Sequence, residues 1–146
     1  MSDTRRGKQV GFYVLSEPTE FVKHYECAAW SCTVIVAPGR YPVWAEIENG
    51  KVKDYPGLMV TMPATVVEDY FQSLFGGNAI GKAYDRKQNA GKADTFSTSV
   101  YAHSAAEDIL TKGEASRWVL DGFVPERIEF EYNGKPCVTH GIREAE

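Results

Sequence analysis

The sequence lacks the features that mark a secreted or membrane-bound protein. Its three cysteines cannot all pair within one chain, and there is no Asn-X-Ser/Thr glycosylation site. No stretch approaches the roughly 18 apolar residues that cross a bilayer. The apolar run at residues 10–15 is too short for the core of a signal peptide. We therefore expect a cytoplasmic protein that is not secreted and has no membrane partner.

Positive charge is also in short supply. The chain has 16 Lys and Arg residues against 20 Asp and Glu residues, which gives a formal net charge of −4. A dedicated nucleic-acid binder carries a basic surface for the phosphates, so nucleic acid is an unfavoured partner. The hydrophobic content of 43% and the length of 146 residues are typical of one globular domain. We expect residues 1–146 to form a single domain with a polar N-terminal tail at about 1–7.

Two Asn-Gly pairs are the most specific structural signals. Asn49-Gly50 and Asn133-Gly134 each separate two segments in which apolar and polar residues alternate. The tight type I′ turn needs positive φ at both central residues, which Asn and Gly tolerate. The sequence therefore predicts a β-hairpin around each pair. Pro136 lacks an amide donor, so its strand should begin late or lie at the edge of a sheet.

Other segments are rich in the β-branched and aromatic residues that favour strands. They lie at residues 9–15, 31–37, 58–62, 95–102 and 116–120. The segment from Thr33 to Val36 is β-branched throughout, which predicts a central strand.

Two segments have the spacing of helices. Residues 63–75 repeat apolar side chains at helical intervals, with Pro63 suited to the first turn and Gly76 to the end. Residues 105–112 follow Ser104, which forms a capping box with Glu107. We therefore predict an α+β fold, a mainly antiparallel sheet of about six to eight strands with two helices packed on one face.

The segment 76–94 is Gly-rich and lacks clear periodicity. It carries four basic residues against two acidic ones, a net charge of +2 in an acidic chain. Its spacing Gly-x4-Gly-Lys resembles a phosphate-binding loop, but Ala83 replaces the usual Ser or Thr and a predicted helix, not a strand, precedes it. We therefore favour binding of a protein partner or an anion over a nucleotide site. The residues predicted to do so are Lys82, Tyr84, Arg86, Lys87 and Lys92.

Aromatic residues gather around the first hairpin, with a guanidinium among them. Such a set can stack on a flat ligand or anchor a protein interface, or it can belong to the core of the sheet. The aromatic residues are Trp30, Tyr41, Trp44 and Tyr55, and the predicted binding residues are Trp30, Arg40, Tyr41 and Trp44.

No pattern of residues predicts catalysis, a metal or a cofactor. Cys137 and His140 lie three apart on a predicted strand, which directs them to opposite faces. There is no Gly-x-Ser-x-Gly elbow for a serine nucleophile. We therefore predict a non-enzymatic interaction domain, a small accessory or inhibitory protein acting on a larger protein. The alternative is a small-ligand sensor or small enzyme with a pocket between sheet and helices near the first hairpin, lined by aromatics and one of Glu46, Glu48, His103 or His140.

Overall fold

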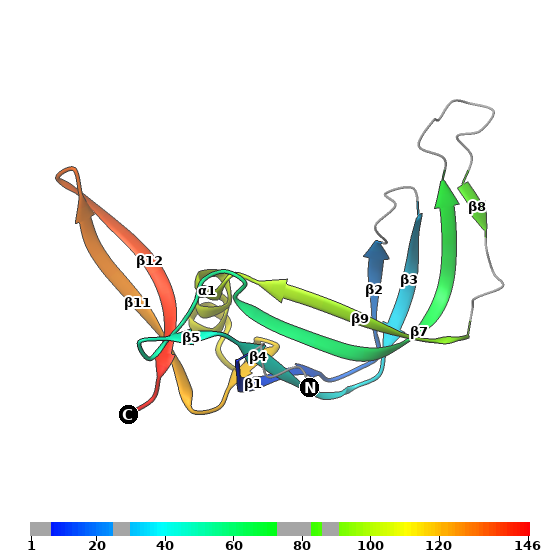
Figure 1. Cartoon of the computed structure of the whole chain (residues 1–146), viewed down its shortest axis with the longest axis horizontal. Helices are drawn as coiled ribbons and strands as arrows, with labels where there is room; N and C mark the ends of the chain where they lie inside the picture. Colours follow the sequence, from blue (N-terminus) through cyan, green and yellow to red (C-terminus); the bar gives the residue numbers. More distant parts are fainter. Residues whose placement is uncertain (1–6, 25–29, 73–82, 86–90) are drawn as a thin grey trace. The chain divides into compact units, whose positions relative to one another are not determined.

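The structure is a computed structural model that describes residues 7–24, 30–72, 83–85 and 91–146 (Figure 1). The chain divides into two compact units. The first comprises residues 1–14, 40–61 and 97–146, and the second comprises residues 15–39 and 62–96.

The described residues form twelve β-strands, one α-helix and a short 3-10 helix. In chain order they are β1 (Lys8–Leu15), β2 (Thr19–His24), β3 (Trp30–Val36), β4 (Gly39–Ala45), β5 (Ile47–Glu48), β6 (Lys51–Val52), β7 (Leu58–Gln72), β8 (Ala83–Asp85), β9 (Ala93–Val100), α1 (Ala102–Lys112), η3 (Gly113–Ala115), β10 (Trp118–Leu120), β11 (Phe123–Tyr132) and β12 (Lys135–Glu144).

The first unit contains parts of two antiparallel sheets. In one sheet β1 pairs with β10, β4 pairs with the first residues of β7, and β9 lies beside β7. The other sheet has the order β11-β12-β6-β5. The helix α1 packs against β10, β11 and β12 and buries Ala102, Ala105 and Ala106. Leu58 and Ile142 are fully buried in the same unit.

The second unit is built from β2, β3, the later part of β7, β8 and the first residues of β9. β3 pairs with β2 on one side and with β7 on the other. It is therefore a central strand, as its β-branched sequence predicted. Its buried side chains, and those of β7, alternate along each strand. They are Cys32, Val34 and Val36 on β3, and Met62, Ala64 and Val66 on β7.

Both Asn-Gly hairpins are confirmed. Asn49 and Asn133 have φ of 56° and 52°, and Gly50 and Gly134 both have φ of 77°. The first turn joins β5 to β6, and the second joins β11 to β12 with Tyr132 opposite Lys135. The strand expected before the first turn is interrupted at Glu46, because β4 and β5 belong to different sheets. The expectation of a mainly antiparallel fold is therefore correct, but the described residues form twelve strands, eight in one sheet and four in another, rather than six to eight in one sheet.

The helix predicted over residues 63–75 is wrong in its described part, because residues 58–72 form the strand β7. Burial alternates with period two between buried Ala64 and Val66 and exposed Thr65 and Val67. Thr65, Val66 and Val67 are β-branched and lose little by being extended, and this part of the strand gains pairing partners in β3 and β8. Residues 73–75 lie outside the described part of the chain. Only one of the two predicted helices is thus present among the described residues.

The second predicted helix is confirmed, but it begins earlier and is capped differently. α1 starts at Ala102, so Ser104 lies inside it and does not act as the N-cap. The helix instead receives its cap from Asp54, whose backbone oxygen accepts from Ala102 and whose carboxylate accepts from His103. Gly113 ends the helix, as predicted. No helix among the described residues is long and apolar enough to cross a membrane.

Candidate functional site

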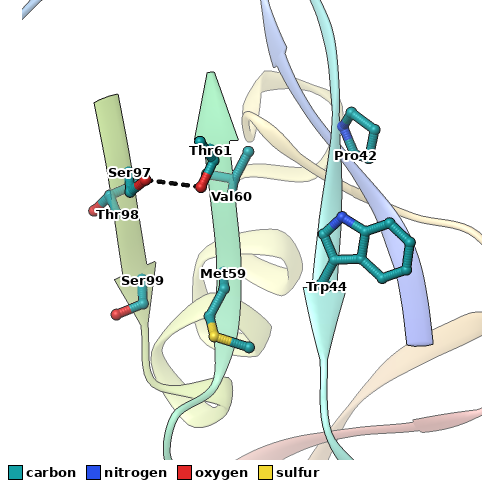
Figure 2. A pocket seen from close by; sticks show the side chains of 8 residues that line it. All are labelled: Pro42, Trp44, Met59, Val60, Thr61, Ser97, Thr98 and Ser99. Atoms are coloured by element: carbon teal, nitrogen blue, oxygen red, sulfur yellow. Dashed lines mark hydrogen bonds between the residues drawn. The ribbon is translucent and has the colours of Figure 1, made fainter. Parts of the chain in front are cut away.

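A groove of about 700 Å³ lies on the first unit, across β4, β7 and β9. Figure 2 shows these three strands side by side, with β7 in the middle. The lining residues come from one short stretch of each strand. They are Pro42 and Trp44 on β4, Met59, Val60 and Thr61 on β7, and Ser97, Thr98 and Ser99 on β9.

The pleat of the strands explains why these side chains meet. Trp44 lies directly opposite Met59 in the β4–β7 pairing, so both project on the same face. Their neighbours Val43 and Val60 are also opposite each other, and both are almost completely buried on the other face. The core residues of the sheet therefore fix the outward direction of Trp44 and Met59.

The far wall of the groove is a row of hydroxyl groups. Ser97 and Ser99 are exposed and alternate with half-buried Thr98 on β9. The hydroxyl oxygens of Thr61 and Ser97 lie 2.7 Å apart and share a hydrogen bond between β7 and β9 (Figure 2). This contact holds the polar wall against the middle strand. Each hydroxyl still has acceptor capacity for a ligand.

The groove combines one apolar wall with one polar, uncharged wall. Trp44 is 40% exposed, although indole is among the most hydrophobic side chains. Met59 beside it is half-buried and adapts its shape to a contact. The lining side chains that project from the same face as Trp44 offer stacking, apolar contact and hydroxyl hydrogen bonds. Such a surface suits an uncharged ligand that has an apolar part and a few polar atoms.

The structure separates the aromatic residues predicted as one set around the first hairpin. Trp44 lines the groove, and Arg40, four residues earlier on β4, lies on the same face of the strand. The Arg40 guanidinium stacks over the Phe12 ring at 4.3 Å, so this cation is held by β1. Tyr41 is half-buried and occupies the opposite face of β4 by alternation. Trp30 belongs to the second unit, where its backbone pairs with Phe71.

Most of the predicted basic loop falls outside the described residues, including Lys82, Arg86 and Lys87. Tyr84 lies on β8, where its backbone pairs with Phe71. Lys92 is exposed immediately before β9, and its backbone oxygen accepts from the Val66 amide at 2.9 Å. The role of this loop stays a prediction.

A second surface cluster lies at the start of α1, apart from the groove lining. The exposed rings of Tyr55 and Tyr101 lie 6.1 Å apart, and His103 stacks on Tyr101 at 5.4 Å. Partial burial raises the pKa of Asp54, but the hydrogen bonds from the backbone and ring of His103 together outweigh it. The pKa of Asp54 therefore lies below its usual value, and the carboxylate is ionised at neutral pH.

Neither Glu46, Glu48, His103 nor His140, the groups considered for a sensing or catalytic pocket, is among the groove's lining residues. Sequence reasoning missed Met59, Thr61 and the hydroxyl row of β9. The alternation of Ser97 and Ser99 with Phe96 and Val100 is the signal that could have found one wall. Nothing in the sequence shows that β9 and β4 flank the same strand.

Within the described residues, no three His, Cys, Asp or Glu side chains are grouped as a metal site would require. No protein-family model, curated protein or solved structure matches the chain.

Proposed function

We propose that this protein is a binding module that holds an uncharged, partly apolar segment of a larger protein in the β4–β7–β9 groove. The observation that carries the proposal is the pair Trp44 and Met59, which lie opposite each other on the solvent face of the sheet beside the hydroxyls of Ser97 and Thr61. Trp and Met are enriched at the centres of protein interfaces, where a few residues supply most of the affinity.

The shape of the groove favours a polypeptide segment over an enclosed small molecule. Four of its lining residues, Pro42, Thr61, Ser97 and Ser99, are exposed, and Trp44 is 40% exposed. A small-molecule site usually surrounds most of its ligand. A shallow surface of this kind instead receives side chains that project from a partner, with the hydroxyl row bonding to the partner's backbone.

The proposal is tested by selecting peptides from a displayed random library with the full chain. We expect the wild type to enrich uncharged peptides that contain aromatic or aliphatic residues. Isothermal titration of one selected peptide should show a loss of about 30-fold in affinity for Trp44→Ala, equal to roughly 2 kcal/mol. Val119→Ala is the matched control, because Val119 is exposed on β10, outside the groove. Equal binding by wild type and Trp44→Ala would rule out this groove as the binding site.

A small uncharged ligand is the second candidate, because a volume of about 700 Å³ lies in the usual range for such sites. A thermal-shift screen of common metabolites separates the two. A ligand at 100 times its Kd stabilises the native state by about 2.7 kcal/mol. A metabolite that stabilises the wild type but not Trp44→Ala would indicate that the groove binds a small molecule rather than a polypeptide.

The basic loop predicted from the sequence is a competing candidate for the binding site, and the same selection can test it. A variant with Lys82, Arg86, Lys87 and Lys92 changed to Ala should retain the affinity of the wild type for a groove-binding peptide. Loss of binding in that variant, with Trp44→Ala unaffected, would assign the interaction to the loop.

A further inference from the structure

The β11–β12 hairpin extends well beyond the point at which β12 pairs with the next strand of its sheet. β12 pairs with β6 only at Arg143, near the base, while β11 and β12 remain paired up to the turn at Asn133. Figure 1 shows the distal half of this hairpin projecting away from α1 and β5. Two strands alone are marginally stable in water, whereas three or more with an apolar face are stable. The distal hairpin therefore has the form of an incomplete sheet.

The exposed residues of this distal half include large apolar side chains. Phe130 is 47% exposed, Tyr132 is 66% exposed and Val138 is 47% exposed. Ile128, Phe130 and Tyr132 alternate along β11 and so lie on one face, with Arg127, Glu129 and Glu131 on the other. These three side chains thus give β11 one apolar face, whereas Val138 lies opposite Glu129, on the face that carries charges of both signs.

The phase of the hydrogen bonds shows which backbone groups of β11 point outward. Ala145 donates to the Gly122 oxygen across the β11–β12 pairing, while Glu144 donates away from it to Gly50. In an antiparallel pair, the backbone N–H and C=O groups of successive residues point alternately toward the partner strand and away from it. Those of the even-numbered residues of β11 therefore bond to β12, and those of the odd-numbered residues point to the outer edge. The groups of Arg127, Glu129 and Glu131 consequently face outward. Among the described residues no strand pairs with this edge.

The side chains at this edge complement those of a second copy of the same edge. If two β11 strands pair antiparallel with Glu129 opposite its own counterpart, Arg127 of each copy faces Glu131 of the other. The same register places Ile128 opposite Phe130 twice on the apolar face. Opposite charges and apolar pairs at directly facing positions both stabilise an antiparallel ladder. The two central Glu129 carboxylates repel each other, but Arg127 forms an ion pair with Glu129 on its own strand.

We propose that the protein forms a two-fold dimer by pairing β11 of one copy with β11 of another, with Arg127 opposite Glu131. The two distal hairpins then become one four-stranded sheet with Ile128 and Phe130 at its centre. This interface is separate from the groove and does not depend on the function proposed for it.

The first test removes one outward-pointing amide. Sedimentation velocity of the full chain should show a dimer fraction that rises with concentration for the wild type. Glu129→Pro should sediment as a monomer at every concentration, because it loses a donor that the dimer needs and the hairpin does not. Glu129→Ala keeps the amide and should dimerise at least as well as the wild type. Circular dichroism checks that each variant keeps its strands.

The second test uses charge and does not alter the backbone. Arg127→Glu and Glu131→Arg each place like charges opposite each other in a homodimer, so each variant alone should be monomeric. In a mixture of the two, both facing pairs are again of opposite charge, and dimers should reappear. The proposal is overturned if the wild type stays monomeric, if folded Glu129→Pro still dimerises, or if the mixture stays monomeric.

Discussion

The Oδ1 atom of Asp54 lies 2.7 Å from the Nδ1 atom of His103 and 2.9 Å from the backbone nitrogen of the same residue, 49 positions further along the chain. One carboxylate thus satisfies an amide in the first turn of α1 and fixes the orientation of an imidazole. It also places negative charge where the helix dipole favours it. The cap of this helix is therefore supplied by a distant segment of the chain.

Asp54→Ala should lower the free energy of unfolding by about 1 kcal/mol, the usual cost of losing an N-cap. Ser104→Ala should change it by less than about 0.5 kcal/mol, because an exposed position inside a helix tolerates alanine. Urea unfolding followed by circular dichroism measures both values. A larger loss in Ser104→Ala than in Asp54→Ala would restore Ser104 as the cap.

Stability should fall in acid through two carboxylates of the first unit. Hydrogen bonds from Ser116 and Lys112 lower the pKa of Asp108, and contacts with His103 lower that of Asp54. A pKa that is lower in the folded state contributes stability above the unfolded pKa, near 3.8 for both groups, and loses it as pH falls through the folded value. The free energy of unfolding should therefore decline progressively below about pH 5.

Urea unfolding at a series of acidic pH values tests this expectation. Asp108→Asn should flatten the decline, because its side chain no longer titrates. Glu107→Gln is the matched control, since Glu107 is exposed on the same helix. An unchanged pH dependence in Asp108→Asn would show that this carboxylate does not contribute.

Gly57 and Gly50 have nearly the same φ, +78° and +77°, but different surroundings. A Cβ at Gly57 would lie 1.9 Å from the backbone oxygen of Val100, whereas a Cβ at Gly50 meets nothing within 4 Å. Gly50→Ala should cost about 1 kcal/mol for the left-handed conformation alone. Gly57→Ala should cost a further 1 to 3 kcal/mol, roughly, for the overlap. Equal unfolding midpoints for the two variants would contradict the close approach at Gly57.

Ser116 is buried and serves two partners. Its hydroxyl donates to Oδ2 of Asp108 at 2.6 Å and accepts from the Trp118 amide at 3.1 Å. Ser116→Ala leaves both partners without this bond and should cost about 1 to 3 kcal/mol. Ser99→Ala, at an exposed position of β9, should leave the thermal midpoint almost unchanged. Equal midpoints for both variants would show that water replaces the Ser116 hydroxyl fully.

The sequence predicted well wherever local geometry decides the outcome. Asn49-Gly50 and Asn133-Gly134 need positive φ, and only a few conformations satisfy that need. Residues 63–72 were misread because their apolar side chains fit a helical face as well as one face of a strand. Extended backbone prevails there because β3 and β8 offer hydrogen-bonding partners, which a local pattern does not contain.

The groove was predicted only in part for the same reason. Trp44 was singled out by its residue type, and it does line the groove. Met59 and Ser97 meet it only through the pairing of β7 with β4 and β9, which joins segments far apart in the sequence. The capping of α1 by Asp54 is a second long-range contact, and it takes the place of the cap that the local Ser104 motif predicted.

Pro125 and Pro136 both occupy positions of the β11–β12 hairpin whose nitrogen points away from the partner strand. Neither residue therefore weakens the hairpin, but each removes a donor from an outer edge. On β11 the missing donor is at Pro125, so the uninterrupted row of outward-pointing amides starts at Arg127. On β12 the missing donor is at Pro136, next to the turn. An assembly through β11 uses the β11 edge of both copies and leaves no β11 edge for a third. Association through this edge alone would therefore close at two chains and would not extend into a filament.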